Sequence, residues 1–107
     1  MKTISINEVL DYGLHDASIE KICIDFQNLN ICIYILASGN LFKFDCINVK
    51  RISGLSFDNK NEPIILTYDI TSTKIKMFTT FSEYLEVDFD EMIIYELNSI
   101  DKGKKHY

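Results

Sequence analysis

The sequence predicts one α+β domain, spanning residues 1–107, that is predominantly antiparallel β-sheet. Apolar and polar residues alternate with a period of two at 29–35 and 64–70, as in half-buried strands. The chain is rich in Ile, Phe and Tyr but has one Pro and four Gly, and branched and aromatic side chains suit a pleated surface. Its 107 residues are enough for one hydrophobic core. We expect a meander of about six to eight strands forming a curved sheet, half-barrel or sandwich, with a short N-terminal helix.

The first expected element is a helix of one or two turns within 5–12. Ser5 is a favourable N-cap, Glu8 stands in the first turn, and apolar residues occur at 6, 9 and 10. Gly13 suits the end of such a helix. Because the helix is so short, it needs packing against the rest of the fold to be stable.

The next two strands are expected to form a hairpin. The isoleucines of the first strand, 18–26, share one face only if the chain slips by one residue near Glu20-Lys21, as at a β-bulge. A tight turn at Gln27-Asn28 then joins inward residues of both strands. The predicted pairs are Phe26 with Leu29, Ile24 with Ile31, Ile22 with Ile33 and, on the outer face, Cys23 with Cys32.

The middle of the chain predicts further strands separated by turns. After a turn at 37–40, the third strand places Phe42, Phe44 and Cys46 on the inner face, so Cys46 should be buried. The pattern from 47 to 57 is irregular, which indicates a bend and a short strand. The polar run 58–63 is the best candidate for a loop. Beyond it, alternating residues at 64, 66, 68 and 70 and then at 75, 77, 79 and 81 predict two strands around a turn at 71–74.

The C-terminal part admits two interpretations. Leu85, Val87 and Phe89 predict one strand, and residues 92–97 predict a last one. Alternatively, an aspartate at 88 or 90 caps a helix that carries residues 93, 97 and 100 on one side. The charged tail, 101–107, is expected to fray.

Charge and hydropathy bear on the partners and the compartment. Eleven basic and sixteen acidic residues give a net charge of −5, which repels phosphate backbones and anionic lipids. We therefore expect neither a nucleic acid nor a membrane as partner, whereas a basic protein is compatible. No apolar run approaches the roughly 20 residues of a membrane span, and the first residues do not resemble a signal peptide. A cytoplasmic protein is expected.

Cysteine and histidine usage predicts neither a metal nor a cofactor. The three cysteines, Cys23, Cys32 and Cys46, are an odd number and form no C-x-x-C motif, which indicates reduced thiols. With only two histidines, no cluster has zinc-ligand spacing. The glycines are scattered, so no phosphate-binding loop is expected. A disulfide or thiol switch between Cys23 and Cys32 is the alternative interpretation.

His15 and Asp16 are the most suggestive pair for catalysis. A catalytic histidine needs a substrate proton within reach and a partner that fixes its tautomer, but adjacent residues of an extended chain point in different directions. Aspartate can instead accept backbone N–H groups at a turn, and an imidazole can bridge backbone groups. We interpret the pair as a structural corner. The alternative is a small hydrolase that uses both side chains.

Acidic residues supply the candidate binding surface. A calcium loop of the helix-flanked type needs a central glycine that this sequence lacks there, and nothing selects a glycosidase pair from sixteen acids. Solvated strand edges are the simplest interpretation. The functional one is a protein-binding patch with an aromatic anchor. Its candidate residues are Asp58, Glu62, Glu83, Tyr84, Glu86, Asp88, Asp90 and Glu91.

The corner and the strands after it resemble a known group of proteins. The residues that carry the resemblance are Leu14-His15-Asp16-Ala17, the alternating isoleucines of 19–25, the strand 29–35, and Leu41-Phe42-Lys43-Phe44 with Val49. Small bacterial proteins that open with an L-H-D-A or L-H-D-S corner are similar, and several are regarded as immunity proteins of polymorphic or contact-dependent toxin systems.

This resemblance implies a non-enzymatic protein that neutralises a cognate toxin domain by direct binding. A monomer or weak homodimer is expected, and negative charge would speed the capture of a basic toxin domain. A third alternative, besides the hydrolase, is a structural subunit that self-associates through an open sheet edge.

Overall fold

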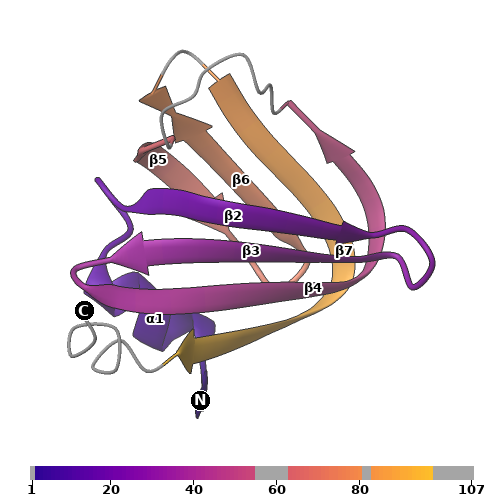
Figure 1. Cartoon of the computed structure of the whole chain (residues 1–107), viewed down its shortest axis with the longest axis horizontal. Helices are drawn as coiled ribbons and strands as arrows, with labels where there is room; N and C mark the ends of the chain where they lie inside the picture. The colour runs from indigo at the N-terminus through magenta and orange to yellow at the C-terminus, as the bar shows by residue number, and fades with distance from the viewer. Residues whose placement is uncertain (1, 55–62, 81–82, 98–107) are drawn as a thin grey trace.

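The computed structural model describes residues 2–54, 63–80 and 83–97. These residues contain seven antiparallel strands and one short helix (Figure 1). The strand order is β2-β3-β4-β7-β6-β5, and β1 pairs with β7. This confirms the predicted α+β, mainly antiparallel class. The elements are β1 (Lys2–Ile4), α1 (Ile6–Tyr12), β2 (Ser18–Asp25), β3 (Asn30–Ala37), β4 (Asn40–Ser53), β5 (Ile65–Ile70), β6 (Lys74–Thr79) and β7 (Glu83–Leu97).

The two long strands, β4 and β7, bend together and fold the sheet into two facing layers (Figure 1). The first layer contains β1, β2, β3, the start of β4 and the end of β7. The second contains β5, β6, the start of β7 and the end of β4. At the bend, the inward positions change from Cys46 to Val49 on β4 and from Met92 to Phe89 on β7, and these residues pair in register. Asn48 has a φ of 56° there, in the left-handed region that helps a strand turn.

The shared bend explains two wrong predictions. A short separate strand was expected after Ile47, and two strands, or a helix, after Leu85. Instead β4 and β7 each continue through the bend. Three residues rather than two separate successive inward positions on each strand, so the alternation breaks at the bend, and the register of β4 with β7 shifts just beyond it, between Val49 and Arg51.

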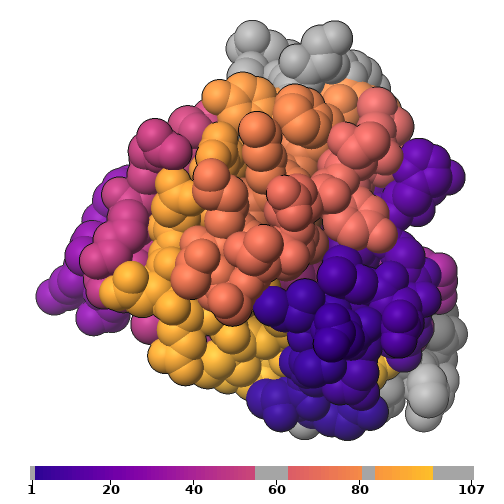
Figure 2. Space-filling model, turned by 180° about the vertical axis from the view of Figure 1, so that it is seen from behind, coloured from indigo at the N-terminus to yellow at the C-terminus, as the bar shows by residue number. Residues whose placement is uncertain are grey.

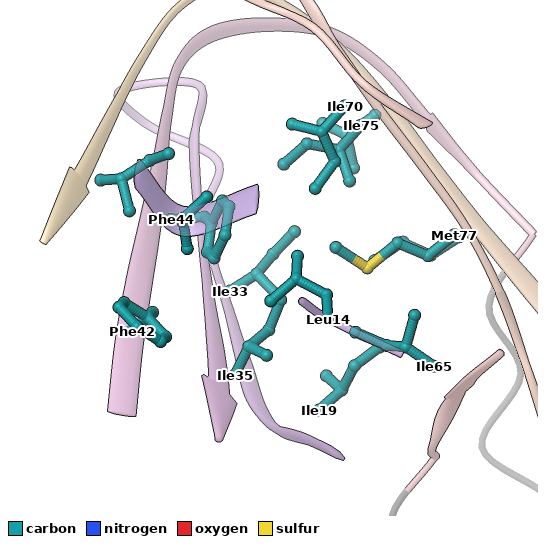
Figure 3. Close-up of a cluster of buried hydrophobic side chains, with 14 of the residues drawn as sticks. Leu14, Ile19, Ile33, Ile35, Phe42, Phe44, Ile65, Ile70, Ile75 and Met77 are labelled. Carbon is teal, nitrogen blue, oxygen red and sulfur yellow. The ribbon is translucent and has the colours of Figure 1, made fainter. Parts of the chain in front are cut away.

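The hydrophobic core lies between the two layers (Figure 3). Ile33, Phe42 and Phe44 project from the first layer, and Ile75 and Met77 from the second; all are fully buried. Burying such side chains contributes about 1.5–3 kcal/mol each before the cost of ordering them.

Helix α1 packs on the first layer as expected. Ser5 and Glu8 form the reciprocal bonds of a capping box, and the Gly13 N–H bonds to Leu10 at the other end. The Tyr12 ring meets Phe42 edge-on, with centroids 5.0 Å apart.

The predicted β2–β3 hairpin is confirmed for most of its length. The register shifts between Ile19 and Lys21, and Cys23 pairs with Cys32. The inward placement of Phe26 and Leu29 is wrong, because pairing ends before the turn and their exposed fractions are 82% and 51%.

Strands β5 and β6 form the expected hairpin, but β5 is shifted. A register shift between Ile65 and Thr67 buries Ile65 and leaves Leu66 exposed, the reverse of the predicted alternation. Strand β1 was not predicted, because three residues carry no detectable period. The predicted loop up to 62 and the tail 101–107 lie outside the described residues. Within the described ranges, no helix has the length and apolarity needed to cross a membrane.

Candidate functional site

The Leu14–Ala17 corner ties the two ends of the strand order together. The Asp16 N–H donates to the Ile65 carbonyl and the Ile65 N–H donates to the Ala17 carbonyl, both at 2.8 Å. Leu14 is fully buried in the core. The corner therefore joins the beginning of β2 to the beginning of β5, where an isolated bridge also pairs Ser18 with Ile64.

The imidazole of His15 is oriented by the main chain. Its Nδ1 lies 2.7 Å from the Leu66 carbonyl oxygen, so the Nδ1–H donates to that oxygen. Its Nε2 is 3.7 Å from the Asp16 carboxylate, which is longer than a hydrogen bond. Asp16 thus does not fix the tautomer as the aspartate of a catalytic triad does. Both side chains are mostly exposed, so the geometry favours an outward-facing corner over a sheltered catalytic pair.

Two of the three cysteines lie in environments that keep their thiols protonated. Cys23, Cys32 and Cys46 are all free. Burial and the neighbouring Asp45 carboxylate raise the pKa of the Cys32 thiol, and burial raises the pKa of Cys46 to about 12. Since the thiolate is the nucleophile, Cys32 and Cys46 remain protonated and unreactive at neutral pH.

Two acidic residues of β7, Glu86 and Asp88, are paired with cations of neighbouring strands. On the outer face of the second layer, Lys74 Nζ lies 2.9 Å from a Glu86 carboxylate oxygen, and Arg51 Nη2 lies 3.0 Å from one of Asp88. Each cation also lies 3.7 Å from the other carboxylate. We call Arg51, Lys74, Glu86 and Asp88 the charge network. Figure 2 shows the side of the molecule on which this layer lies.

The remaining predicted binding residues are spread along β7. Asp90 is bound by Lys50 and Asn48. Tyr84 is partly exposed beside Phe78, with ring centroids 5.9 Å apart. Glu91 is exposed at the bend and Glu83 opens the strand. Asp58 and Glu62 lie outside the described residues. The structure thus aligns Tyr84, Glu86, Asp88 and Asp90 on one face, but as a paired surface rather than a free acidic patch.

An apolar groove at the end of the β2–β3 hairpin was missed by the sequence analysis. It encloses about 350 Å³ between the hairpin turn and the second half of β4. Its walls carry large side chains with exposed fractions of 45% for Ile24, 82% for Phe26, 51% for Leu29 and 38% for Ile52. One signal was available, because apolar residues on both sides of a tight turn have no strand partner to cover them.

The outer face of the first layer carries a row of alternating lysines and tyrosines. Strand pairing sets Lys21 beside Tyr34, Tyr34 beside Lys43, and Lys43 beside Tyr95. Lys21 Nζ lies 5.5 Å from the Tyr34 ring centroid, and Lys43 Nζ lies 5.5 Å from that of Tyr95. We call these four residues the lysine–tyrosine row. The neighbouring row on the same face is formed by Leu36, Leu41 and Leu97.

Comparison of the chain with protein-family models, curated proteins and solved structures finds no match. Among the residues that the structure describes, no group of three or more His, Cys, Asp or Glu side chains could hold a metal ion. Neither the hairpin groove nor a smaller hollow beside Tyr68 and Phe78 is lined by His15 or Asp16.

Proposed function

We propose that this chain is a non-enzymatic binding protein that neutralises a cognate toxin domain by direct contact, as an immunity protein does. The observation that carries the proposal is the apolar groove at the β2–β3 hairpin. Clustered exposed apolar side chains of this kind are typical of protein–protein contact sites. The resemblance of the Leu14–Ala17 corner to immunity proteins suggests which class of protein the groove binds.

Phe26 is the strongest candidate anchor in the groove. It is the most exposed large apolar side chain of the described residues, and a buried aromatic residue commonly contributes much of the binding energy of an interface. Ile24, Leu29 and Ile52 surround it and would exclude water from the contact. A small catalytic site is less well supported, since His15 faces solvent away from the groove.

The proposal is tested by expressing toxin domains encoded beside this gene in a bacterial host, with and without this chain. We expect one such domain to arrest growth alone, and growth to resume when this chain is present. The two proteins should then copurify as a complex. Failure of every neighbouring toxin to be neutralised would overturn the proposal.

A variant pair locates the contact. Phe26→Asp combined with Leu29→Asp should weaken the complex about tenfold or more, because both changes place a charge in the apolar groove. Leu29 has a φ of 57°, which aspartate tolerates better than leucine, so the variant should remain folded. Leu66→Asp is the control for a new surface charge elsewhere, since Leu66 is 42% exposed on β5 and does not line the groove. Equal weakening by both variants would argue against the groove.

A further inference from the structure

The lysine–tyrosine row and the leucine row beside it place many apolar side chains on the outer face of the first layer. Its tyrosines and the adjacent leucine row are half-buried, so this antiparallel layer has apolar side chains on its outer as well as its inner face. An antiparallel sheet with one solvated face normally alternates between apolar and polar residues. The outer face of the first layer is therefore more apolar than that of a sheet whose outer face contacts only water.

The lysines of this face differ from most of the other described cations, Lys76 over the Phe78 ring being the exception. Lys2, Lys50, Arg51 and Lys74 each lie within ion-pair distance of a carboxylate. Within the described ranges, Lys21 and Lys43 have no such partner and lie over tyrosine rings instead. Asp45 lies in the row on the other side of the lysine–tyrosine row, between Cys32 and Ile93, and accepts a hydrogen bond from the Cys32 thiol. Two cations with unused donors thus stand among aromatic and aliphatic side chains.

We propose that the outer face of the first layer docks a partner protein through a surface of that partner that combines carboxylates with apolar side chains. Lys21 and Lys43 receive the carboxylates, and Tyr34 and Tyr95 pack against the apolar groups. Tyrosine is enriched at interfaces because its ring is apolar and its hydroxyl can hydrogen-bond. A ring beneath each ammonium group restricts its motion, so less side-chain entropy is lost on binding. The inference rests on the proposed function only in that the partner is a protein.

Charge complementarity favours this occupant over two others. A second copy of the chain on a two-fold axis would bring the same lysines against each other, and like charges oppose such contact. A nucleic acid carries a phosphate at every nucleotide, of which two lysines can neutralise few, so the net charge of −5 opposes it more than a protein surface with a few carboxylates. The partner expected from net charge alone was basic, but the acids Glu86, Asp88 and Asp90 are already paired.

The test uses a fluorescein-labelled copolymer of glutamate and tyrosine, which presents carboxylates and aromatic groups, and measures binding by fluorescence anisotropy. We expect saturable binding at low salt that weakens at high salt. Lys21→Glu combined with Lys43→Glu should weaken binding about tenfold or more. Lys21→Arg combined with Lys43→Arg should retain it, because both cations remain.

The control variant has the same net charge but leaves this face intact. Lys2→Glu combined with Lys76→Glu changes two other lysines, of which Lys76 lies over the Phe78 ring on the second layer. It should weaken binding less than about threefold, since screening limits distant charges. Equal loss in the two glutamate variants would show that only net charge matters and would overturn the inference. Thermal melting of each variant verifies that it is folded.

Three other results would also overturn it. The first is no binding of the copolymer by the unchanged protein. The second is tighter binding of an oligothymidylate probe, which would assign the face to single-stranded nucleic acid. The third is a dimer in light scattering that the Lys21→Glu, Lys43→Glu variant dissolves, which would assign the face to a second copy.

This experiment fails or succeeds independently of toxin neutralisation. If a neighbouring toxin is neutralised but the copolymer does not bind, the immunity function stands and the docking inference falls. If the copolymer binds as expected but no toxin is neutralised, the docking inference stands and the immunity function falls.

Discussion

The outer faces of the two layers differ in the contacts that their cations make. On the second layer, Arg51 and Lys74 lie within 3.7 Å of both Glu86 and Asp88, so the face is charged but internally neutralised. On the first layer, Lys21 and Lys43 cover tyrosine rings instead of carboxylates. Four charges of the second layer therefore pair with one another, although Lys76 lies over the Phe78 ring there, whereas neither lysine of the lysine–tyrosine row has a carboxylate partner among the described residues.

The difference shows that net charge is a poor guide to the charge of a binding face. The chain is acidic as a whole, yet Glu86, Asp88 and Asp90 on the outer face of β7 have cationic partners within the same sheet. What a partner meets is decided by which charges remain unpaired, and these depend on strand neighbours. Variants in each layer test whether the two layers also differ in their contribution to the free energy of unfolding.

The largest expected effect is at the core of the first layer. Phe44→Ala removes a fully buried ring and should lower the free energy of unfolding by about 3–5 kcal/mol, through lost burial and the cavity left behind. Urea denaturation followed by circular dichroism measures it. Since β4 and β7 belong to both layers, we expect one cooperative transition. Separate transitions for the two layers would show that they are independent units.

The second effect is at the top of the second layer. Gly54 has a φ of 104°, and a Cβ there would stand 2.3 Å from the Tyr84 carbonyl oxygen. Gly54→Ala should cost about 1–3 kcal/mol for the backbone conformation alone, and more for displacing β7. Gly39→Ala is the control, because Gly39 also has a positive φ but a Cβ there meets nothing within 4 Å. Equal destabilisation of the two variants would mean that the contact with Tyr84 is unimportant.

Alternation along single strands was enough to predict much of the fold. The β2–β3 hairpin was predicted with its bulge because only one register pairs inward residues with inward residues, as Ile22 with Ile33. The capping box of α1 was equally local. Patterns of this kind are contained within a few neighbouring residues, and packing reinforced them.

Features that depend on contacts between residues far apart in the sequence were not predicted. Arg51 and Asp88 are separated by 37 positions, and their ion pair requires knowing that β4 lies beside β7. The irregular pattern after Ile47 predicted a bend, which is confirmed, and a short strand, which is wrong because β4 continues to Ser53; one strand viewed alone does not show that its partner bends with it. The groove also depends on distant residues, because it forms between the β2–β3 hairpin turn and the second half of β4.

The third prediction concerns helix α1, which contributes Val9 to the core and contacts Phe42 of the first layer through Tyr12. Ser5→Ala removes the acceptor for the Glu8 N–H and should cost about 1 kcal/mol, which lowers Tm by roughly 4–8 °C in a domain of this size. Ser72→Ala, in the exposed turn before β6, should change Tm little. Hydrogen exchange should accelerate in α1 before it accelerates in β6. Faster exchange in both at once would indicate that the helix supports the whole sheet.

The smallest expected change in stability is at the charge network, and its dependence on pH identifies its cause. The hydrogen bond from Lys74 holds the pKa of Glu86 below its ordinary value, so the ionised carboxylate is favoured in the folded state. A lowered pKa contributes stability that is fully present above the unfolded value, about 4.3, and is lost as pH falls through the folded value. Glu86→Gln should therefore be less stable than the unchanged protein at pH 7, and the difference should shrink on acidification below about pH 4.3.

A double-mutant cycle ties this loss to its cause. Lys74→Met removes the cation that also has its own pKa raised by Glu86, so Glu86→Gln in that background should show a much weaker pH dependence. Urea midpoints at several pH values give the comparison. A Glu86→Gln effect that is constant with pH would show that the network orders the surface without stabilising the fold. The second layer would then be neutral in charge for reasons other than stability, and avoidance of unwanted partners would be the better explanation.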